Sequence, residues 1–532
     1  MSLRRALSFA ASLLAVSAAS AQDYDVVVRD ARVVDGTGAP WFRADVAVRG
    51  DAVIAVGPSL GGEAERTIHA RGRVLAPGFI DLHTHARRGI FEVPTADNYL
   101  LQGVTTLFDG QDGSSPLPLG EHLDSVAMLP PAVNFGSFVG HGAVREAVLG
   151  REDRAPTKQE LDRMADLVRQ AMHEGAFGLS TGLFYVPGAF ATTDEVVALA
   201  RVAGAAGGIH VSHMRDEAAG VLDSVRETIA IGERGSLPTQ ITHHKIIGRA
   251  GWGRSAETLR LVEQARRRGV DVTIDQYPYT ASSTSLAAAL FPAWGLEGGP
   301  DEVSRRLADL AERQRLRAAV AGKIDAERGG GDPARIQIAA CSFDGALVGR
   351  DLATVLRERG REPTVDEAAE LVLEIVERGG ATGIFHAIGE EDVERILASP
   401  FTMVASDGEV PVFGEGAPHP RSYGTFPRVL AVYVREKGLL TLEQAVQKMT
   451  SLPAARVGLA DRGLVRPGMK ADLVLLDPAI VRDRATFERP HAYAEGIVAV
   501  LVNGVPVVED GRLTGARPGR VLRGPGARSP RP

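Results

Sequence analysis

Short apolar runs separated by turn residues mark both ends of the chain. Near the start, Val26–Val28 and Val53–Val56 are two such runs, and Asp35-Gly36-Thr37-Gly38 lies between them as a turn. Near the end, Leu473–Leu476 and Ile497–Val502 repeat the pattern, and Asn503-Gly504 follows as a turn. β-Branched runs joined by Gly and Asn turns are typical of hairpins. Neither block is long enough for an independent sheet, so we expect residues 22–76 and 463–516 to pair in one small β-sandwich.

Between these blocks, residues 77–462 alternate strand-like and helix-like patterns. The strand-like runs are 105–108, 208–211, 240–242, 270–274 and 403–405, and the helical stretches are 161–173, 194–206 and 256–268. Such alternation over more than 250 residues predicts an α/β fold, a (β/α)8 TIM-like barrel. Residues 290–370 are less regular and are interpreted as an insertion. The Arg-, Pro- and Gly-rich residues 517–532 are expected to be a disordered tail.

The first 21 residues have the features of a signal peptide. Arg4 and Arg5 precede an apolar run from Ala6 to Val16, and Ala19-Ser20-Ala21 is a small-residue cleavage site. We therefore expect export to the periplasm or secretion, by either the general or the twin-arginine route. The apolar run is too short for a mature membrane span.

Composition narrows the class of protein further. The 532 residues include 60 Lys and Arg against 67 Asp and Glu, a net charge of −7, which argues against a general nucleic-acid binder. Cys341 is the only cysteine, which excludes an internal disulfide and any cysteine-rich zinc module. The sequence does not fix the oligomeric state.

Candidate metal ligands follow the predicted barrel strands. Phe79-Ile80-Asp81-Leu82-His83-Thr84-His85 places two imidazoles on one face of a strand end. His213, His243 and Asp407 each come directly after another apolar run. Catalytic side chains of barrels lie at the carboxyl ends of strands, and convergent imidazoles and carboxylates bind divalent metals. Asp407 can both bind metal and act as the general base on a metal-activated water.

Several motifs, found in order along nearly the whole mature chain, resemble those of the N-acyl-D-amino-acid deacylases (D-aminoacylases), a family of metal-dependent amidohydrolases. They are Ala76–His85, Gly103–Thr106, Gly175–Leu183, Ser212–Glu217, Thr242–Lys245, Asp275–Ser283, Ser406–Gly408, His419–Arg428 and Gly463–Leu473.

The resemblance implies zinc, as one or two divalent ions. It assigns His83, His85 and Asp407 to one site and His213 and His243 to a second. The family has a cysteine after Gly-Val-Thr-Thr that completes the second site, and this chain has Asp112 there. Asp109 is a competing candidate from the same loop, and Asp112 can also be read as a turn residue. A carboxylate binds zinc but is a harder ligand than a thiolate.

The resemblance also assigns Lys245, Tyr277 and Ser283 to the substrate carboxylate. Arg215 and Arg421 either add to an anion pocket or pair with Asp216 and Glu217. His141 and His244 are expected to pack or to orient ligands rather than to bind metal, and His386 and His419 are further pocket candidates.

The expected reaction is hydrolysis of an N-acyl-D-amino acid, a small-molecule substrate, to a carboxylate and a free D-amino acid. Two alternatives stay open. One is a different amidohydrolase chemistry, such as a dipeptidase, cyclic-amide hydrolase or ester hydrolase, because a fold does not determine a reaction. The other is an inactive exported binding protein, favoured only by the missing family cysteine.

Overall fold

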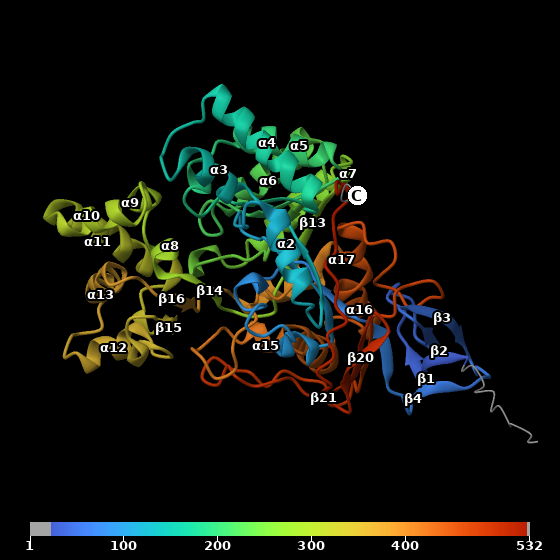
Figure 1. Cartoon of the computed structure of the whole chain (residues 1–532). Helices are drawn as coiled ribbons and strands as arrows, with labels where there is room; N and C mark the ends of the chain where they lie inside the picture. The colour runs from blue at the N-terminus through green and yellow to red at the C-terminus, as the bar shows by residue number, and fades with distance from the viewer. Residues whose placement is uncertain (1–22, 529–532) are drawn as a thin grey trace, which may run out of the picture.

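A computed structural model describes residues 23–528 of the chain, so the predicted signal peptide lies outside the described residues. Three parts follow one another along the long axis of the molecule (Figure 1). Strands of the amino-terminal residues form one end, a barrel lies in the middle, and a helical subdomain forms the other end. No helix among the described residues is both long and apolar enough to cross a membrane.

The apolar pattern predicted that the two chain ends pair in a small β-sandwich, and strands from both ends join in one nine-stranded sheet. Its order is β21-β20-β19-β18-β5-β1-β2-β3, and β4 pairs with β1. The antiparallel pair of β5 with β18 connects the two ends, with Leu75 opposite Leu475. The strands are β1 Tyr24–Val33, β2 Phe42–Arg49, β3 Ala52–Gly57, β4 Ala64–His69, β5 Val74–Pro77, β18 Leu473–Leu476, β19 Ile497–Val502, β20 Val505–Glu509 and β21 Arg512–Leu513.

The middle of the chain forms the predicted parallel barrel. Two parallel sheets, β6-β7-β8 and β9-β10-β11-β12-β13-β17, meet where β8 runs into β9 through Phe138. A parallel bridge between Thr84 and Gly408 closes the barrel between β6 and β17. The strands are β6 Phe79–Asp81, β7 Val104–Asp109, β8 Asn134–Ser137, β9 Val139–Gly140, β10 Gly178–Gly182, β11 Ile209–His213, β12 Thr239–Ile241, β13 Val272–Gln276 and β17 Thr402–Val404.

Helices surround the barrel where the sequence pattern placed them. The predicted helices at 161–173, 194–206 and 256–268 correspond to α4 Lys158–Glu174, α5 Thr193–Ala205 and α7 Ser255–Arg267. α4 begins at a capping box in which Thr157 and Glu160 satisfy each other's backbone N–H groups. The other helices are α1 Asp97–Leu100, α2 Leu119–Met128, α3 His141–Leu149, α6 Val221–Gly235, α14 Glu390–Ala398, α15 Arg421–Arg428, α16 Leu442–Met449 and α17 Ser451–Arg456.

The insertion expected at 290–370 is part of a larger subdomain with its own sheet and core. Its sheet has the order β14-β16-β15, and residues between Leu286 and Phe385 form a separate hydrophobic cluster. This subdomain is the yellow lobe in Figure 1. Its elements are β14 Ser282–Ser285, α8 Leu286–Leu290, α9 Ala293–Leu296, α10 Pro300–Ala308, α11 Leu310–Lys323, the π-helical η4 Ile324–Arg328, β15 Ile336–Ala340, α12 Leu352–Glu358, α13 Val365–Glu377 and β16 Thr382–Phe385.

The prediction of a disordered tail was wrong for residues 517–528. Phe135 N–H donates to Arg520 O, and Leu522 N–H donates back to Phe135 O. A Cβ at Gly519 would lie 2.1 Å from Val133 O, and one at Gly524 would lie 2.1 Å from Ala176 O. The glycines that resembled a disordered composition therefore allow close backbone packing on the barrel. Residues 529–532 lie outside the described range.

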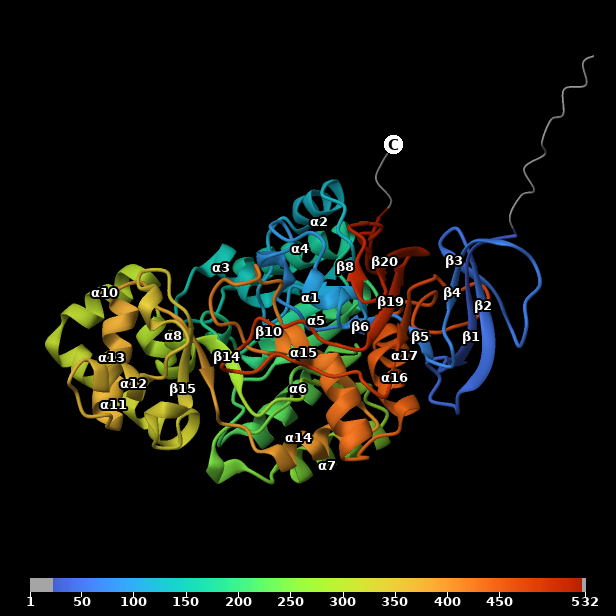
Figure 2. The ribbon, with the colours of Figure 1, turned by 90° about the horizontal axis from the view of Figure 1, so that it is seen from below.

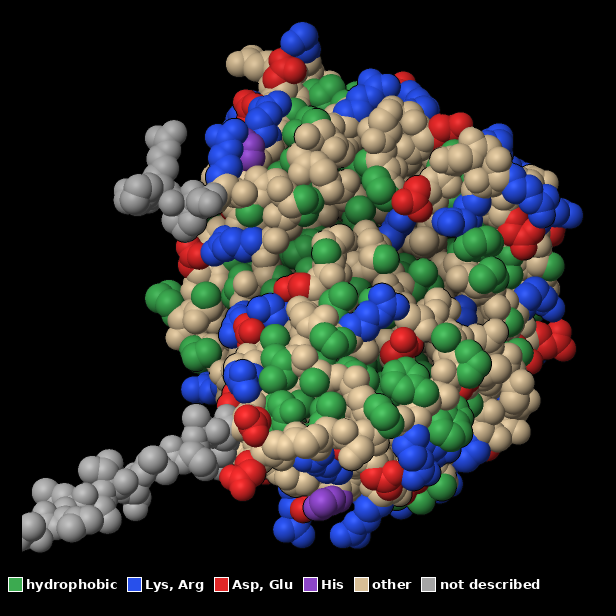
Figure 3. Space-filling model, turned by 90° about the vertical axis from the view of Figure 1, so that its right-hand side faces the viewer, with side chains coloured by type: hydrophobic (Ala, Val, Ile, Leu, Met, Phe, Trp, Pro, Cys, Tyr) green, Lys and Arg blue, Asp and Glu red, His purple; other side chains and the backbone are tan. Residues whose placement is uncertain are grey.

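The face of the molecule that carries the amino-terminal strands shows no large basic patch. Lys and Arg side chains alternate there with Asp and Glu, and apolar side chains lie between them (Figure 3). This mixture agrees with the balanced composition of the chain.

Candidate metal centre and active site

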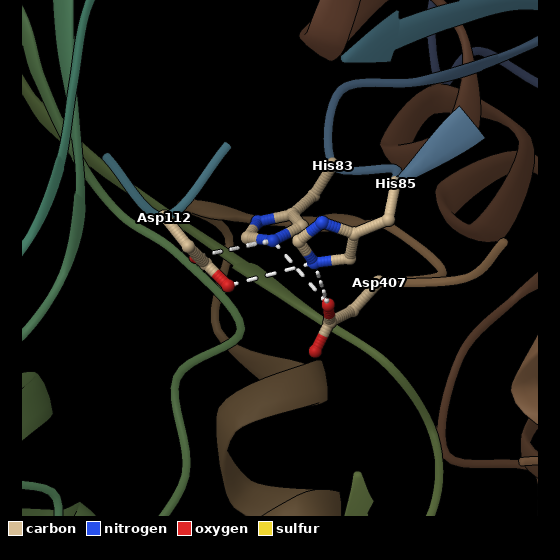
Figure 4. Close-up of side chains that lie close together, drawn as sticks. All are labelled: His83, His85, Asp112 and Asp407. Carbon is tan, nitrogen blue, oxygen red and sulfur yellow. Dashed lines mark hydrogen bonds and ion pairs between the residues drawn. The ribbon is translucent and has the colours of Figure 1, made fainter. Parts of the chain in front are cut away.

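The carboxyl ends of five barrel strands bring the predicted ligands together. His83 and His85 follow β6, and Asp112 follows β7. His213 ends β11, while His243 and Asp407 come just after β12 and β17. Figure 4 shows His83, His85, Asp112 and Asp407 pointing toward one another. Two groups of metal-binding atoms result, one of His83, His85, Asp112 and Asp407, the other of Asp112, His213 and His243.

Asp112 belongs to both groups and touches all four imidazoles. Its Oδ1 lies 3.5 Å from His83 Nε2, 3.5 Å from His213 Nδ1 and 3.3 Å from His243 Nε2. Its Oδ2 lies 3.5 Å from His85 Nε2. Asp112 is therefore shared by the two groups of candidate metal ligands.

The backbone at three of these ligands adopts the left-handed conformation. Asp112, His243 and Asp407 have φ angles of 56°, 35° and 51°. Such angles cost about 1–3 kcal/mol each in non-glycine residues and persist where the surrounding structure holds them in place. Strained backbone of this kind is concentrated at functional sites, and here it occurs at three convergent candidate ligands.

The donor atoms fit a divalent metal. His83 Nε2 and both ring nitrogens of His213 are buried and have no hydrogen-bond partner among the described residues. Buried polar atoms without partners are rare unless an unseen group satisfies them. Imidazole nitrogens with carboxylate oxygens, all within 4.8 Å of one another in each group, are a typical donor set for zinc.

Asp407 lies between the histidines and a buried arginine. Its Oδ1 is 3.1 Å from His85 Nε2, and its Oδ2 is 2.6 Å from Arg421 Nη1. Burial alone would raise the pKa of Asp407, but the Arg421 guanidinium and the neighbouring imidazoles lower it well below its usual range. The carboxylate is therefore ionised, as a metal ligand has to be.

Glu217 is a site residue that the sequence analysis did not single out as one. Its Oε1 lies 3.2 Å from His243 Nδ1, and its Oε2 lies 3.8 Å from His213 Nε2. Burial opposes its charge, yet the Lys245 ammonium and these imidazoles lower the pKa of Glu217 well below its usual range. One carboxylate thus faces the far nitrogens of both histidines of the second group. The only indication of this role in the sequence is that Glu217 lies four residues after His213.

The metal-binding atoms open into a cavity of about 560 Å³. Lys245 and Ser283, both predicted to bind the substrate carboxylate, are part of its lining. The Lys245 ammonium already pairs with Glu217 Oε1 at 2.6 Å. The Tyr277 hydroxyl is buried without a hydrogen-bond partner among the described residues, and the Arg421 guanidinium lies 4.8 Å from the centre of its ring.

Comparison with known proteins identifies the family. The model of the amidohydrolase family matches residues 66–508. The D-aminoacylase of Alcaligenes xylosoxydans xylosoxydans is 39% identical over 540 residues, covering 95% of this chain and 99% of that protein. The chain belongs to the D-aminoacylase branch of the amidohydrolase family.

Two solved structures of this branch match the fold closely. A D-aminoacylase structure with a binuclear metal centre has a TM-score of 0.80 and 38% identity, and the match covers 94% of this chain and 100% of that chain. An N-acyl-D-glutamate deacylase from Bordetella bronchiseptica, complexed with zinc and a phosphonate inhibitor, has a TM-score of 0.80 and 36% identity, covering 94% and 99%. The D-aminoacylase resemblance and the barrel fold expected from the sequence are confirmed.

The structure contradicts one of the two alternatives for Arg215 and Arg421, the pairing with Asp216 and Glu217. Arg215 pairs with Glu227 at 2.9 Å, and Arg421 pairs with Asp407. Neither pairs with Asp216 or Glu217, because the Asp216 carboxylate instead accepts hydrogen bonds from nearby backbone N–H groups.

Three other polar candidates from the sequence analysis are not among the candidate metal ligands of the structure. Asp109 is buried and pairs with Arg87 at 3.3 Å. His141 bonds to Glu195, and His244 bonds to Thr258, so both pack as expected rather than bind metal.

Of the two remaining pocket candidates, only one lines the cavity. His419 lines the cavity, and His386 instead packs against Phe487. Cys341, which no family motif placed in the site, packs against the subdomain core.

Proposed function

We propose that this chain is a metal-dependent hydrolase that converts N-acyl-D-amino acids to a carboxylate and a free D-amino acid. The observation that carries this function is the pair of ligand groups joined by Asp112, in the cavity of a chain that aligns with D-aminoacylase along nearly its whole length. We also propose zinc as the metal, because imidazole and carboxylate donors suit it.

His83, His85 and Asp407 would hold one ion, and His213 and His243 the other, with Asp112 shared. A bound divalent metal polarises the acyl carbonyl and lowers the pKa of water. Asp407 accepts the proton of the attacking water as the new C–O bond forms. It then returns this proton to the amide nitrogen as the C–N bond breaks, so that the free amine leaves. Lys245, Tyr277 and Ser283 are proposed to orient the α-carboxylate.

The test is release of amino acid from paired N-acetyl-D and N-acetyl-L substrates. The protein lacking residues 1–21 is assayed as purified, after chelation, and after zinc is restored. Release from the D series that chelation abolishes and zinc restores is the expected result. No release from either series in zinc-loaded protein contradicts the proposal and directs the search to dipeptides, cyclic amides and esters. A protein that binds no metal and releases nothing supports the inactive binding protein.

Export is a separate proposal that rests on residues 1–21 alone. Expression of the full chain in a bacterial host, followed by fractionation and amino-terminal sequencing, tests it. A mature protein that begins at Gln22 outside the cytoplasm is expected. A full-length cytoplasmic product would contradict it.

A further inference from the structure

The cationic side chains of the cavity are all paired except one. Six arginine and lysine side chains line the cavity. Five have a carboxylate within 4 Å, namely Arg87 with Asp109, Arg88 with Glu409, Arg151 with Glu146, Lys245 with Glu217, and Arg421 with Asp407. The sixth, Arg328, makes no ion pair with any residue that the structure describes.

Arg328 is also deeply buried, with only 4% of its surface exposed. Its guanidinium carbon lies 5.2 Å from the centre of the Phe184 ring and 5.8 Å from that of Phe385. Its only hydrogen bond to a described residue is a long one, 3.5 Å from Nη1 to Ser282 Oγ, and its Nε has none. A buried charge that is neither paired nor fully hydrogen-bonded is costly, and contacts with aromatic faces offset only a small part of that cost.

The subdomain holds Arg328 in a fixed place at the cavity wall. Arg328 ends η4, which packs on the loop after β12 so closely that a Cβ at Gly248 would lie 3.0 Å from Ala326 O. Gly248 N–H also donates to Ala387 O at 2.9 Å, which connects that loop to the segment after β16. The packing of η4 therefore fixes the position of the Arg328 guanidinium.

Arg328 lies one aromatic ring away from the metal-binding atoms. Phe184, which it contacts, stacks on the imidazole of His213 with ring centres 5.4 Å apart. Ser282, its hydrogen-bond partner, is adjacent to Ser283 of the cavity lining. A substrate whose amide lies at the metal-binding atoms has room for a side chain that extends past Phe184 toward the guanidinium.

We propose that Arg328 binds the side-chain carboxylate of the substrate, so that this enzyme prefers N-acyl derivatives of acidic D-amino acids, glutamate or aspartate. The inference rests on the proposed deacylase function. The planar guanidinium matches a carboxylate in geometry and charge, and a bound carboxylate supplies the counter-charge that the fold omits. Arg421, Lys245 and Tyr277 remain for the α-carboxylate and the reacting centre.

The experiment compares kcat/KM for N-acetyl-D-glutamate, N-acetyl-D-aspartate and N-acetyl-D-leucine in three proteins. These are the wild type, Arg328→Met and Arg315→Met. Arg315 is a matched control, because its exposed guanidinium also stacks on an aromatic ring of the subdomain, 4.0 Å from the centre of Trp294, but does not line the cavity. Arg328→Lys is added, and thermal melting of every variant checks folding.

The wild type is expected to favour the acidic substrates over the leucine substrate. Arg328→Met is expected to lower the ratio of kcat/KM for glutamate over leucine on the order of a hundredfold. Arg328→Lys should restore part of the ratio, and Arg315→Met should leave it unchanged. A wild type that prefers leucine overturns the inference. So does an equal loss on all substrates in Arg328→Met, which would mean that Arg328 binds the α-carboxylate or only supports the fold. No release from any D substrate by the wild type means instead that the deacylase function itself is wrong.

Discussion

Replacing Glu217 by Gln tests whether one carboxylate orients the histidines of the second ligand group. The substitution keeps the side-chain volume and removes the charge that lies 3.2 Å from His243 Nδ1 and 3.8 Å from His213 Nε2. Loss of a partner that orients a metal-binding histidine lowers metal affinity about 10–100-fold. Since the close contact of Glu217 is with His243 alone, we expect a loss within this range, about 10–100-fold or roughly 1.4–2.7 kcal/mol.

The assay is titration of chelated protein with zinc in competition with a chromogenic chelator, with metal content measured by mass spectrometry. The ion held by His83, His85 and Asp407 should keep its affinity, while the second ion is lost at low zinc. Glu227→Gln is the matched control, because Glu227 is also a largely buried partner of a cation, Arg215, but touches no metal-binding residue.

Glu217→Gln also leaves the Lys245 ammonium buried without its counter-charge, so a second variant separates the two effects. The double variant Glu217→Gln with Lys245→Met removes that charge and should still bind the second ion weakly. Wild-type affinity in the single variant, or an equal loss at both ions, would refute the assigned role. Recovery of affinity in the double variant would assign the effect to the lysine.

Three further predictions concern stability and metal choice. Burial lowers the pKa of Lys448 to about 8, so between pH 8 and 10.5 the unfolded chain binds more protons than the folded one. The free energy of unfolding should therefore rise by about 2 kcal/mol between pH 7 and 9.5 relative to Lys448→Met, and parallel denaturation curves would contradict this. Asp112→Cys with Cys341→Ala should bind zinc more tightly and give a cobalt–thiolate absorption band that the Cys341→Ala protein lacks. Ending the chain at Ala516 should lower the melting temperature by roughly 3–6 °C, and an unchanged temperature would mean that the final segment contributes nothing.

The sequence was sufficient for the features that depend on local periodicity. Apolar runs locate the strands, and the residue after each run locates its carboxyl end, so His83, His213 and Asp407 were predicted to meet. Asp112 was found because it occupies the position of the family cysteine.

Features that depend on tertiary packing were missed. Glu217 acquires its role only when β11 and β12 bring His213 and His243 together. Arg328 is distinguished by having no carboxylate partner among residues 23–528, and no sequence pattern predicts the absence of a partner. Gly519 and Gly524 have the composition of a disordered segment, and only the folded barrel shows that they pack closely against its backbone.

The pairing of β5 with β18 also has a consequence for the order of folding. Nearly 400 residues separate the two strands in sequence, and β5 continues almost directly into β6, the strand that carries His83 and His85. Contacts of such long sequence separation form late and slowly. During synthesis the amino-terminal strands must therefore wait for the last part of the chain before their sheet is complete. A chain interrupted before β18 would leave β5, and with it the strand that carries the first two imidazoles, at an unfinished sheet edge.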